Sequence, residues 1–122
     1  MINKNMLHHV HKEGFNERGV YDAYKIFFGT LVSESRLKII NLLRDVRINV
    51  SVIMAELKIY QTAVSHDLAR LRQCGFVNTE RDGKFVYYSL NQGTIKPIMK
   101  LIDAHMSQYC IHILHNIKGG SK

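Results

Sequence analysis

The segment that precedes Gly75 carries polar and basic side chains of the types that hydrogen-bond to nucleic-acid bases. The members of this row are Gln61, Thr62, Ser65, His66 and Arg70. The apolar residues Val64, Leu68 and Leu71 recur at i, i+4 and i+7, which predicts a helix with its other side against a core. A glutamine amide can pair with N6 and N7 of adenine, whereas an arginine or a charged histidine suits guanine or a phosphate. The row therefore predicts a surface that reads the major groove of double-stranded DNA.

A short basic hairpin follows this helix. Gly75 is placed to end the helix in a left-handed cap, and the Asp82-Gly83 pair predicts a tight turn between two strands. Arg81 and Lys84 flank the turn, where they suit phosphates or the minor groove. Helix and hairpin together predict the working part of a winged helix-turn-helix. The alternative is a solvated helix face with ordinary surface charges.

Three more helices must position this unit. They are predicted at 18–28, ending at Gly29, at 33–45, with Ser33 as the N-cap, and at 52–57, with Ser51 as the N-cap. Residues 58–60 then form the turn into the helix that carries the polar row. A short helix, a three-residue turn and a second helix have helix-turn-helix spacing.

A last helix is predicted over residues 94–117, with Pro97 in its first turn. Its apolar stripe is too long to be buried against one small core, so the first and last helices are the expected contact of a two-fold homodimer. The residues predicted at this contact are Tyr24, Phe27, Ile98, Ile102, Met106, Tyr109 and Ile113.

The composition fits a DNA-binding protein. The chain has 122 residues, 17 basic against 10 acidic, a net charge of +7 and a pI near 9.6, so a polyanionic partner is expected. No run of 18 apolar residues would span a bilayer, and the first residues lack the apolar stretch of a signal peptide. A cytoplasmic location without membrane contact is therefore expected.

The fold is predicted to be mainly α with a β-hairpin wing. Its order is four helices, two strands and a final helix, a winged helix-turn-helix that dimerises through its first and last helices. Residues 1–17 are expected to form a flexible arm, and residues 18–117 the domain, with the dimerisation helix at about 94–117.

The chain resembles the ArsR/SmtB family of winged-helix repressors in three segments. Residues 33–43 (SESRLKIINLL) look like that family's second helix, residues 62–71 (TAVSHDLARL) resemble its recognition helix, and residues 75–90 are similar to its wing. The resemblance implies a homodimeric DNA-binding repressor that a ligand or redox signal releases from its operator. Three positions depart from the pattern: Lys58 replaces a turn glycine, Tyr60 replaces a Ser or Thr N-cap, and Asp67 is expected to remove positive charge beside the groove.

The metal sites that the resemblance implies lack their ligands here. Residues 49–51 (NVS) stand where a Cys-x-Cys pair would bind soft metals, and Gln92 and Thr94 stand where an Asp and a His would begin a second site. His105 falls at a ligand position of that second site, but Gln108 replaces its partner.

A different histidine set remains in the last predicted helix. His105 and His112 are spaced i, i+7, and His115 follows three residues later, so the three can lie near one face. Facing sets in a dimer could hold zinc or nickel. The alternative is that these histidines are interface and surface residues, and no metal or cofactor is assigned.

Neither cysteine has an expected disulfide partner. Cys74 ends the helix that carries the polar row and Cys110 lies in the last helix, so a bridge within one subunit is not expected. Cys74 matches a thiolate position of some cadmium and lead sensors in the family, but Arg70 occupies the place of the second thiolate.

An enzyme is not expected, because the chain has no phosphate-cradling glycine loop and no Ser-His or Cys-His set in one cleft. The rival function is a winged helix that binds another protein without operator binding. Four retained basic residues favour DNA: Arg70, Arg72, Arg81 and Lys84.

Overall fold

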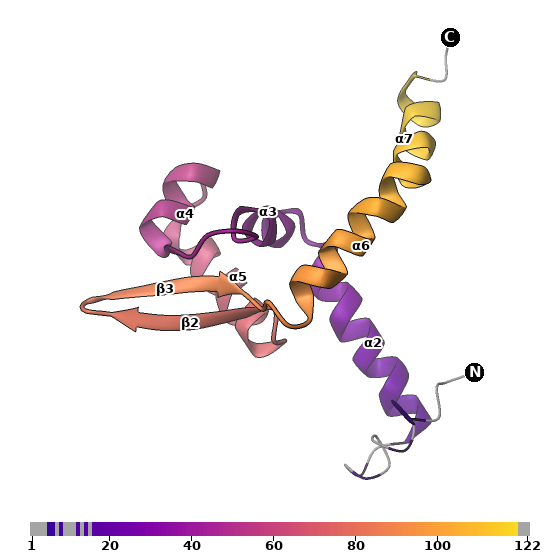
Figure 1. The fold of residues 1–122 in the computed structure, drawn as a ribbon, viewed down its shortest axis with the longest axis horizontal. Helices are drawn as coiled ribbons and strands as arrows, with labels where there is room; N and C mark the ends of the chain where they lie inside the picture. Colours follow the sequence, from indigo (N-terminus) through magenta and orange to yellow (C-terminus); the bar gives the residue numbers. More distant parts are fainter. Residues whose placement is uncertain (1–4, 7, 9–11, 13, 15, 120–122) are drawn as a thin grey trace.

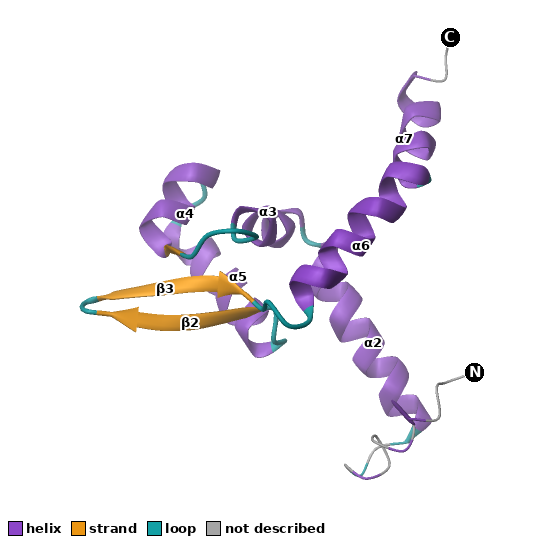
Figure 2. Cartoon of the chain, in the orientation of Figure 1, coloured by secondary structure: helices purple, strands orange, loops and turns teal. Residues whose placement is uncertain are grey.

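The wing and two projecting helical arms lie on opposite sides of the core (Figure 1). The computed structural model describes residues 5, 6, 8, 12, 14 and 16–119. Its helices are α2 (Glu17–Val32), α3 (Glu34–Leu42), α4 (Val50–Leu57), α5 (Gln61–Gln73), α6 (Ile95–Gln108) and α7 (Cys110–Gly119). Its strands are β1 (Ile48–Asn49), β2 (Val77–Asp82) and β3 (Phe85–Leu90) (Figure 2). The predicted mainly helical fold with a hairpin wing is confirmed.

The first long helix, α2, continues past the glycine that was predicted to end it. It runs through Gly29 to Val32. A glycine inside a helix costs only about 1 kcal/mol. Arg36 offsets this cost, because its Nε donates to the carbonyl of Thr30 at 2.8 Å and its Nη2 donates to the carbonyl of Gly29 at 3.4 Å. These carbonyls belong to the last turn, where intrahelical partners are missing.

The N-cap of α3 is predicted correctly and its end is not. Ser33 accepts a 3.3 Å hydrogen bond from the backbone N–H of Arg36, so it is the N-cap. The helix stops at Leu42, three residues before the predicted end at Asp45.

The N-cap of α4 is Asn49, and the predicted cap at Ser51 is wrong. The side chain of Asn49 accepts a 3.0 Å hydrogen bond from the N–H of Val52. Asparagine and serine are both strong N-caps, so residue type alone does not distinguish Asn49 from Ser51. Asn49 also belongs to β1, a strand of two residues that was not predicted.

The sheet has three antiparallel strands in the order β1-β3-β2. In the hairpin Asp82 pairs with Phe85, so the two central residues of the turn are Gly83 and Lys84. The turn therefore lies one residue later than predicted. Gly83 has a φ of +64°, and a positive φ at the first central residue is the conformation that glycine adopts without a steric penalty.

The core is formed where α3, α4 and α5 meet the base of the hairpin and the start of α6. Its buried apolar residues are Ile39, Ile40, Leu43, Ile53, Val64, Leu68, Leu71, Phe76, Val77, Leu90, Ile95 and Met99. Gly75 joins α5 to the hairpin with a φ of +78°. Phe76 N–H donates to Leu71 and Gly75 N–H donates to Arg72, which is the Schellman pattern of helix termination. The predicted glycine cap is confirmed.

The last predicted helix is two helices. It begins at Ile95, close to the predicted start, but α6 ends at Gln108 and α7 begins at Cys110. Tyr109, with φ −126° and ψ −66°, separates them, although α7 continues nearly along the direction of α6 (Figure 1). No helix in the described part of the chain is both long and apolar enough to cross a membrane. Most of the predicted arm at residues 1–17 lies outside the described residues.

Candidate nucleic-acid interface

The turn between α4 and α5 spans residues 58–60, as predicted. Lys58 ends α4 in the left-handed region, with φ 55° and ψ 47°, and its N–H donates a 2.8 Å hydrogen bond to Met54. It is the one non-glycine residue with positive φ among those described. A residue with a Cβ is strained there by roughly 1–2 kcal/mol. The missing glycine therefore leaves the turn in the expected conformation but under strain.

Tyr60 stands at the N-cap of α5 without acting as a side-chain cap. Its side chain is 88% exposed, directly before Gln61. The N–H groups of the first turn of α5 thus lack the side-chain acceptor that a Ser or Thr would supply, and a helix N-terminus of this kind can bind a phosphate. Tyr60 was not among the predicted contact residues.

The structure brings the first four members of the predicted polar row onto one exposed face of α5. They are Gln61, Thr62, Ser65 and His66. Val64, Leu68 and Leu71 lie buried on the opposite side, with at most 1% of each exposed. The apolar side fixes the rotation of the helix, so the polar side must face solvent. This face presents amide, hydroxyl and imidazole groups, which are types that can hydrogen-bond to base edges.

Arg70, the fifth member, points along the flank of α5 toward α2. Its Nε donates a 3.1 Å hydrogen bond to Oγ1 of Thr30, a residue of α2 with 0% exposure. This bond directs the guanidinium toward α2, so the predicted base or phosphate contact could be made only by its two terminal nitrogens, which have no partner among the described residues.

Asp67 lies on the inner side of α5 and not beside the groove, where it was expected to remove positive charge. Only 9% of Asp67 is exposed. Its Oδ2 accepts a 2.6 Å hydrogen bond from Ser35, and its Oδ1 lies 3.3 Å from Nη1 of Arg36. These contacts of the carboxylate hold α5 against α3.

The wing keeps its two predicted basic residues exposed while its acidic residues are paired. Arg47 reaches Glu80 at 2.9 Å and Asp82 at 3.3 Å, and its guanidinium lies 4.4 Å from the ring centre of Tyr87. Alternate residues of a strand share a face, so Arg81 lies on the other face of β2. The described residues hold no hydrogen-bond or ion-pair partner for the side chains of Arg81 and Lys84. Sequence reasoning missed the role of Arg47.

An ion pair joins the segment after α3 to α6. The guanidinium of Arg44 donates to both carboxylate oxygens of Asp103, with 3.2 Å between Nη2 and Oδ1. This hydrogen bonding lowers the pKa of Asp103 below its ordinary value and raises that of Arg44. A second pair, Lys96 with Asp45 at 3.2 Å, lies nearby in sequence.

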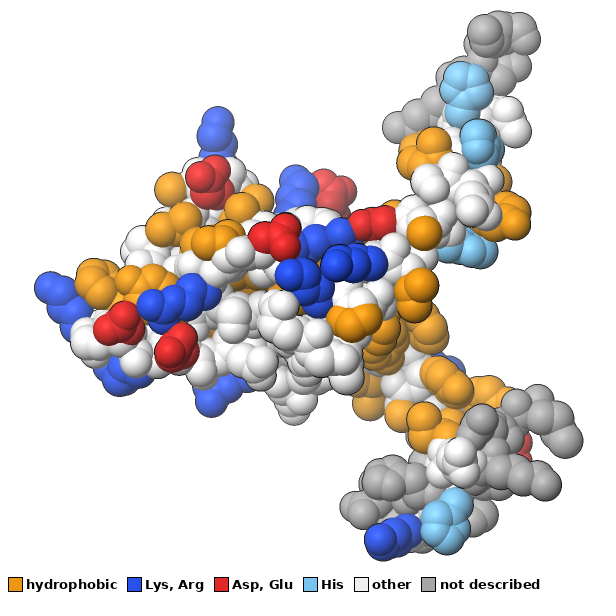
Figure 3. Space-filling view, viewed as in Figure 1, with side chains coloured by type: hydrophobic (Ala, Val, Ile, Leu, Met, Phe, Trp, Pro, Cys, Tyr) orange, Lys and Arg blue, Asp and Glu red, His pale blue; other side chains and the backbone are white. Residues whose placement is uncertain are grey.

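The seven residues predicted for dimer contact fall into two groups. Tyr24, Met106, Tyr109 and Ile113 are exposed. Phe27, Ile98 and Ile102 are half-buried against the core instead. Further exposed apolar residues accompany the first group on α2, α6 and α7, where hydrophobic side chains gather along the projecting helices (Figure 3). They are Tyr21, Phe28, Leu101, Ile111, Leu114 and Ile117.

The histidine candidates are divided by the break at Tyr109. The ring of His105 lies 4.7 Å from the ring of Tyr109, whereas His112 and His115 belong to α7. Within the described part of one chain, no three His, Cys, Asp or Glu side chains are grouped to hold a metal. The side chain of Cys74 is half-buried, that of Cys110 is exposed, and both thiols are free.

Comparison with known proteins identifies relatives of this chain. The sequence model of the bacterial regulatory proteins of the arsR family matches residues 33–79, from the N-cap of α3 into β2. The transcriptional activator HlyU of Vibrio cholerae is 31% identical over 77 residues, which are 63% of this chain and 71% of that protein. The SmtB homologue of Synechocystis, a transcriptional repressor, is 32% identical over 82 residues, which are 67% of this chain and 62% of that protein.

A solved structure of a regulator has a similar fold. The transcriptional regulator HlyU of Vibrio vulnificus superposes with a TM-score of 0.61 at 32% identity, and the match covers 77% of this chain and 94% of that one. These relatives are regulators and not enzymes, as expected for a chain without a catalytic set. The chain belongs to the arsR family of bacterial regulatory proteins.

Proposed function

We propose that this protein is a homodimeric, sequence-specific DNA-binding transcriptional repressor of the cytoplasm. The observation that carries the proposal is the exposed polar face of α5 beside a basic wing. Gln61 and Thr62 stand at the N-terminus of α5, the end that meets base edges in helix-turn-helix proteins. Ser65 and His66 continue the face, and Arg81 and Lys84 supply phosphate contacts from the wing.

The homodimer is supported by the exposed apolar side chains of the projecting helices. Tyr24 on α2 is 44% exposed, and Ile113 on α7 is 58% exposed. Apolar surface that one chain cannot cover marks an interaction site. A second copy presents the same surface, so a two-fold contact covers both. Such a dimer would present two copies of α5 to two half-sites.

Repression is the simplest outcome of this geometry, because a dimer seated on two half-sites excludes other proteins from the same stretch of DNA. The relatives described above include one named activator and one named repressor. The effector stays unidentified, and we assign no metal or cofactor.

The test is duplex binding as a function of salt. An operator is first selected from random duplexes, and its affinity is then measured by fluorescence anisotropy. The logarithm of the binding constant should fall linearly with the logarithm of salt concentration, by about 0.9 for each phosphate neutralised. Absence of duplex binding, or binding indifferent to salt, contradicts the proposal and favours a protein-interaction module.

Variants locate the surface. Gln61→Ala should weaken operator binding by roughly 1–3 kcal/mol if its amide reads a base. The matched control is Gln108→Ala at the exposed end of α6, which should leave the affinity unchanged. Equal effects of the two substitutions would place the DNA elsewhere.

A further inference from the structure

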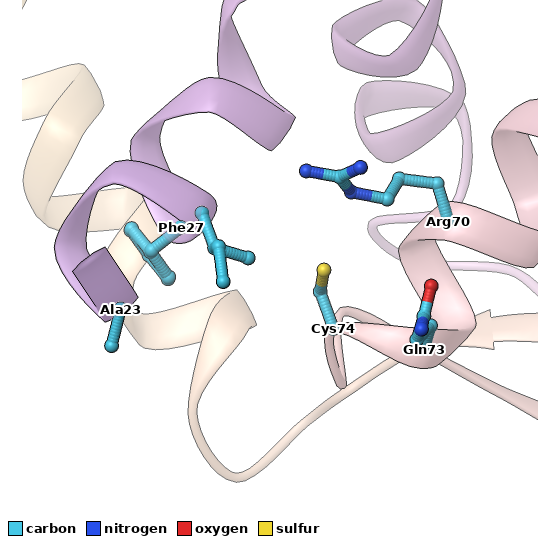
Figure 4. A pocket seen from close by; sticks show the side chains of 6 residues that line it. Ala23, Phe27, Arg70, Gln73 and Cys74 are labelled. Carbon is cyan, nitrogen blue, oxygen red and sulfur yellow. The ribbon is translucent and has the colours of Figure 1, made fainter. Parts of the chain in front are cut away.

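A hollow lies between α2 and the C-terminal half of α5, away from the polar face. Its volume is about 490 Å³, within the range of small-molecule sites. The residues that line it are Ala23, Ile26, Phe27, Arg70, Gln73 and Cys74 (Figure 4). Three of these come from α2, two from α5, and Cys74 is the C-cap of α5, so the hollow bridges the proposed dimer helix and the proposed DNA-reading helix.

One end of the hollow carries a cation with unused hydrogen-bond capacity. Arg70 uses its Nε to hold Thr30, and neither of its terminal nitrogens has a partner among the described residues. Figure 4 shows the guanidinium of Arg70 and the sulfur of Cys74 both extending from α5 toward α2. A guanidinium whose planar edge is free matches the two oxygens of a carboxylate.

The other end is apolar. Ala23, Ile26 and Phe27 form the wall on α2, and Phe27 packs its ring 5.1 Å from that of Phe76 in the core. We propose that this hollow binds a small organic carboxylate, with the carboxylate on Arg70 and an apolar body against the α2 wall. A free inorganic anion would leave that wall uncovered, and a neutral apolar molecule would leave the guanidinium unpaired.

The hollow shares Phe27 with the residues predicted at the dimer contact, but it extends to the side of Ile26. Ile26 and Phe28 are two residues apart, which places them about 200° apart around α2. A partner chain seated on the side of Tyr24 and Phe28 would therefore leave the side of Ile26 open.

Thr30 connects a ligand in the hollow to the position of α5. Its hydroxyl donates to the carbonyl of Ile26 at 2.7 Å and accepts from Arg70. It also lies 3.5 Å from the sulfur of Cys74. A carboxylate on the terminal nitrogens of Arg70 pulls the guanidinium into the hollow and so changes the geometry of the Nε bond to Thr30. This alters the α2–α5 contact, which gives the ligand a differential affinity for the two arrangements. This regulatory step rests on the proposed function, whereas the binding step does not.

The binding test uses the thiol in the hollow as a reporter, in the full-length Cys110→Ser protein without DNA. The alkylation rate of Cys74 by iodoacetamide is followed by mass spectrometry with benzoate, phenylacetate or the neutral phenylacetamide at millimolar concentration. At least one carboxylate should slow the reaction in a saturable way, and phenylacetamide should protect at least about tenfold less well, because it lacks the charge-assisted contact. Protection by neither carboxylate, or equal protection by the amide, overturns the site.

Two pairs of variants separate this site from a general effect. Arg70→Gln should weaken protection by about tenfold, whereas Arg72→Gln, two residues further on the same helix, should not change it. Ile26 is 53% exposed, so a polar replacement is tolerated there without disturbing the fold. Ile26→Glu places a competing carboxylate near Arg70 and should weaken protection relative to the uncharged Ile26→Gln. Equal protection within either pair contradicts the proposal.

The regulatory arm is measured separately on the selected operator. A carboxylate that protects Cys74 should change operator affinity, and Arg70→Gln should abolish that change. Protection without any change in operator affinity overturns the regulatory step and leaves the ligand site. Failure of the proposed function would instead appear as loss of duplex binding before any ligand is added.

Discussion

Arg36 and Asp67 form an ion pair, with 3.3 Å between Nη1 and Oδ1, that fastens α3 to α5. The same guanidinium donates to two carbonyls at the end of α2, those of Gly29 and Thr30. One side chain therefore holds three helices together. The orientation of the polar face of α5 relative to the projecting helix α2 depends on this contact.

Asp67→Asn should destabilise the protein by about 1–3 kcal/mol. The substitution keeps the size of the side chain but removes the charge opposite Arg36, whose side chain is only 21% exposed. A partly buried cation then loses its counter-charge, which is the cost of breaking such a pair. Urea denaturation followed by circular dichroism measures the free energy of unfolding.

The matched control for this substitution is Asp22→Asn. Asp22 lies 3.3 Å from Arg18 in a pair whose two side chains are about 60% exposed. An exposed pair of this kind contributes less than about 0.5 kcal/mol. If the two variants lose equal stability, the Arg36–Asp67 contact does not hold α5 in place.

Local sequence signals predicted the parts of the fold that depend on local contacts. The Ser33 cap, the turn at 58–60 and the left-handed Gly75 each follow from one residue type and its near neighbours. The continuation of α2 through Gly29 does not, because the side chain that satisfies its last carbonyls lies on the next helix. The strand β1 has only two residues, too few to show a period.

The exposed residues of the candidate site were predicted, but the contacts of the residues beside them were not. The helical spacing of the apolar residues placed Gln61 and Thr62 on one polar face of α5. The same helical period places Asp67 on the side of Val64 and Leu71. It could not identify the partners of Asp67, because Ser35 and Arg36 lie more than 30 positions away in sequence. The contact of Arg70 could not be predicted for the same reason, since its partner Thr30 is 40 positions away.

Lys58→Gly should stabilise the protein by up to about 1 kcal/mol. Lys58 has a φ of 55°, where a Cβ is strained and glycine is not. Part of the gain is lost to the larger conformational freedom of glycine in the unfolded chain. Lys58→Ala, which removes the charge and keeps the Cβ, is the control and should not stabilise. A Gly variant less stable than the wild type in urea denaturation would contradict the strain.

Asp103 should make stability depend on pH at the acid end. Hydrogen bonding from Arg44 lowers the pKa of Asp103 below its ordinary value of 3.8 in the folded protein. A lowered folded pKa means that this stabilisation is present above pH 3.8 and is lost as the pH falls through the folded pKa. The effect should stay below about 1 kcal/mol, since the carboxylate is half exposed.

The measurement is the difference in free energy of unfolding between the wild type and Asp103→Asn across the acid range. The difference should be constant near neutral pH and shrink as Asp103 of the wild type becomes protonated. A difference that grows on acidification would mean that the pKa of Asp103 is raised and not lowered.

Ile113→Asp should convert the proposed dimer into monomers. Ile113 is 58% exposed in the single chain, and a contact between projecting helices would bury it. An aspartate without a counter-charge in such an interface costs at least about 3 kcal/mol, or more than about a hundredfold in dimer affinity. Sedimentation velocity distinguishes one 14.1 kDa chain from two.

Asn116→Asp places the same charge on an exposed polar position of α7 and should leave the dimer intact. If the Ile113→Asp protein sediments as a dimer like the wild type, α7 does not belong to the dimer contact.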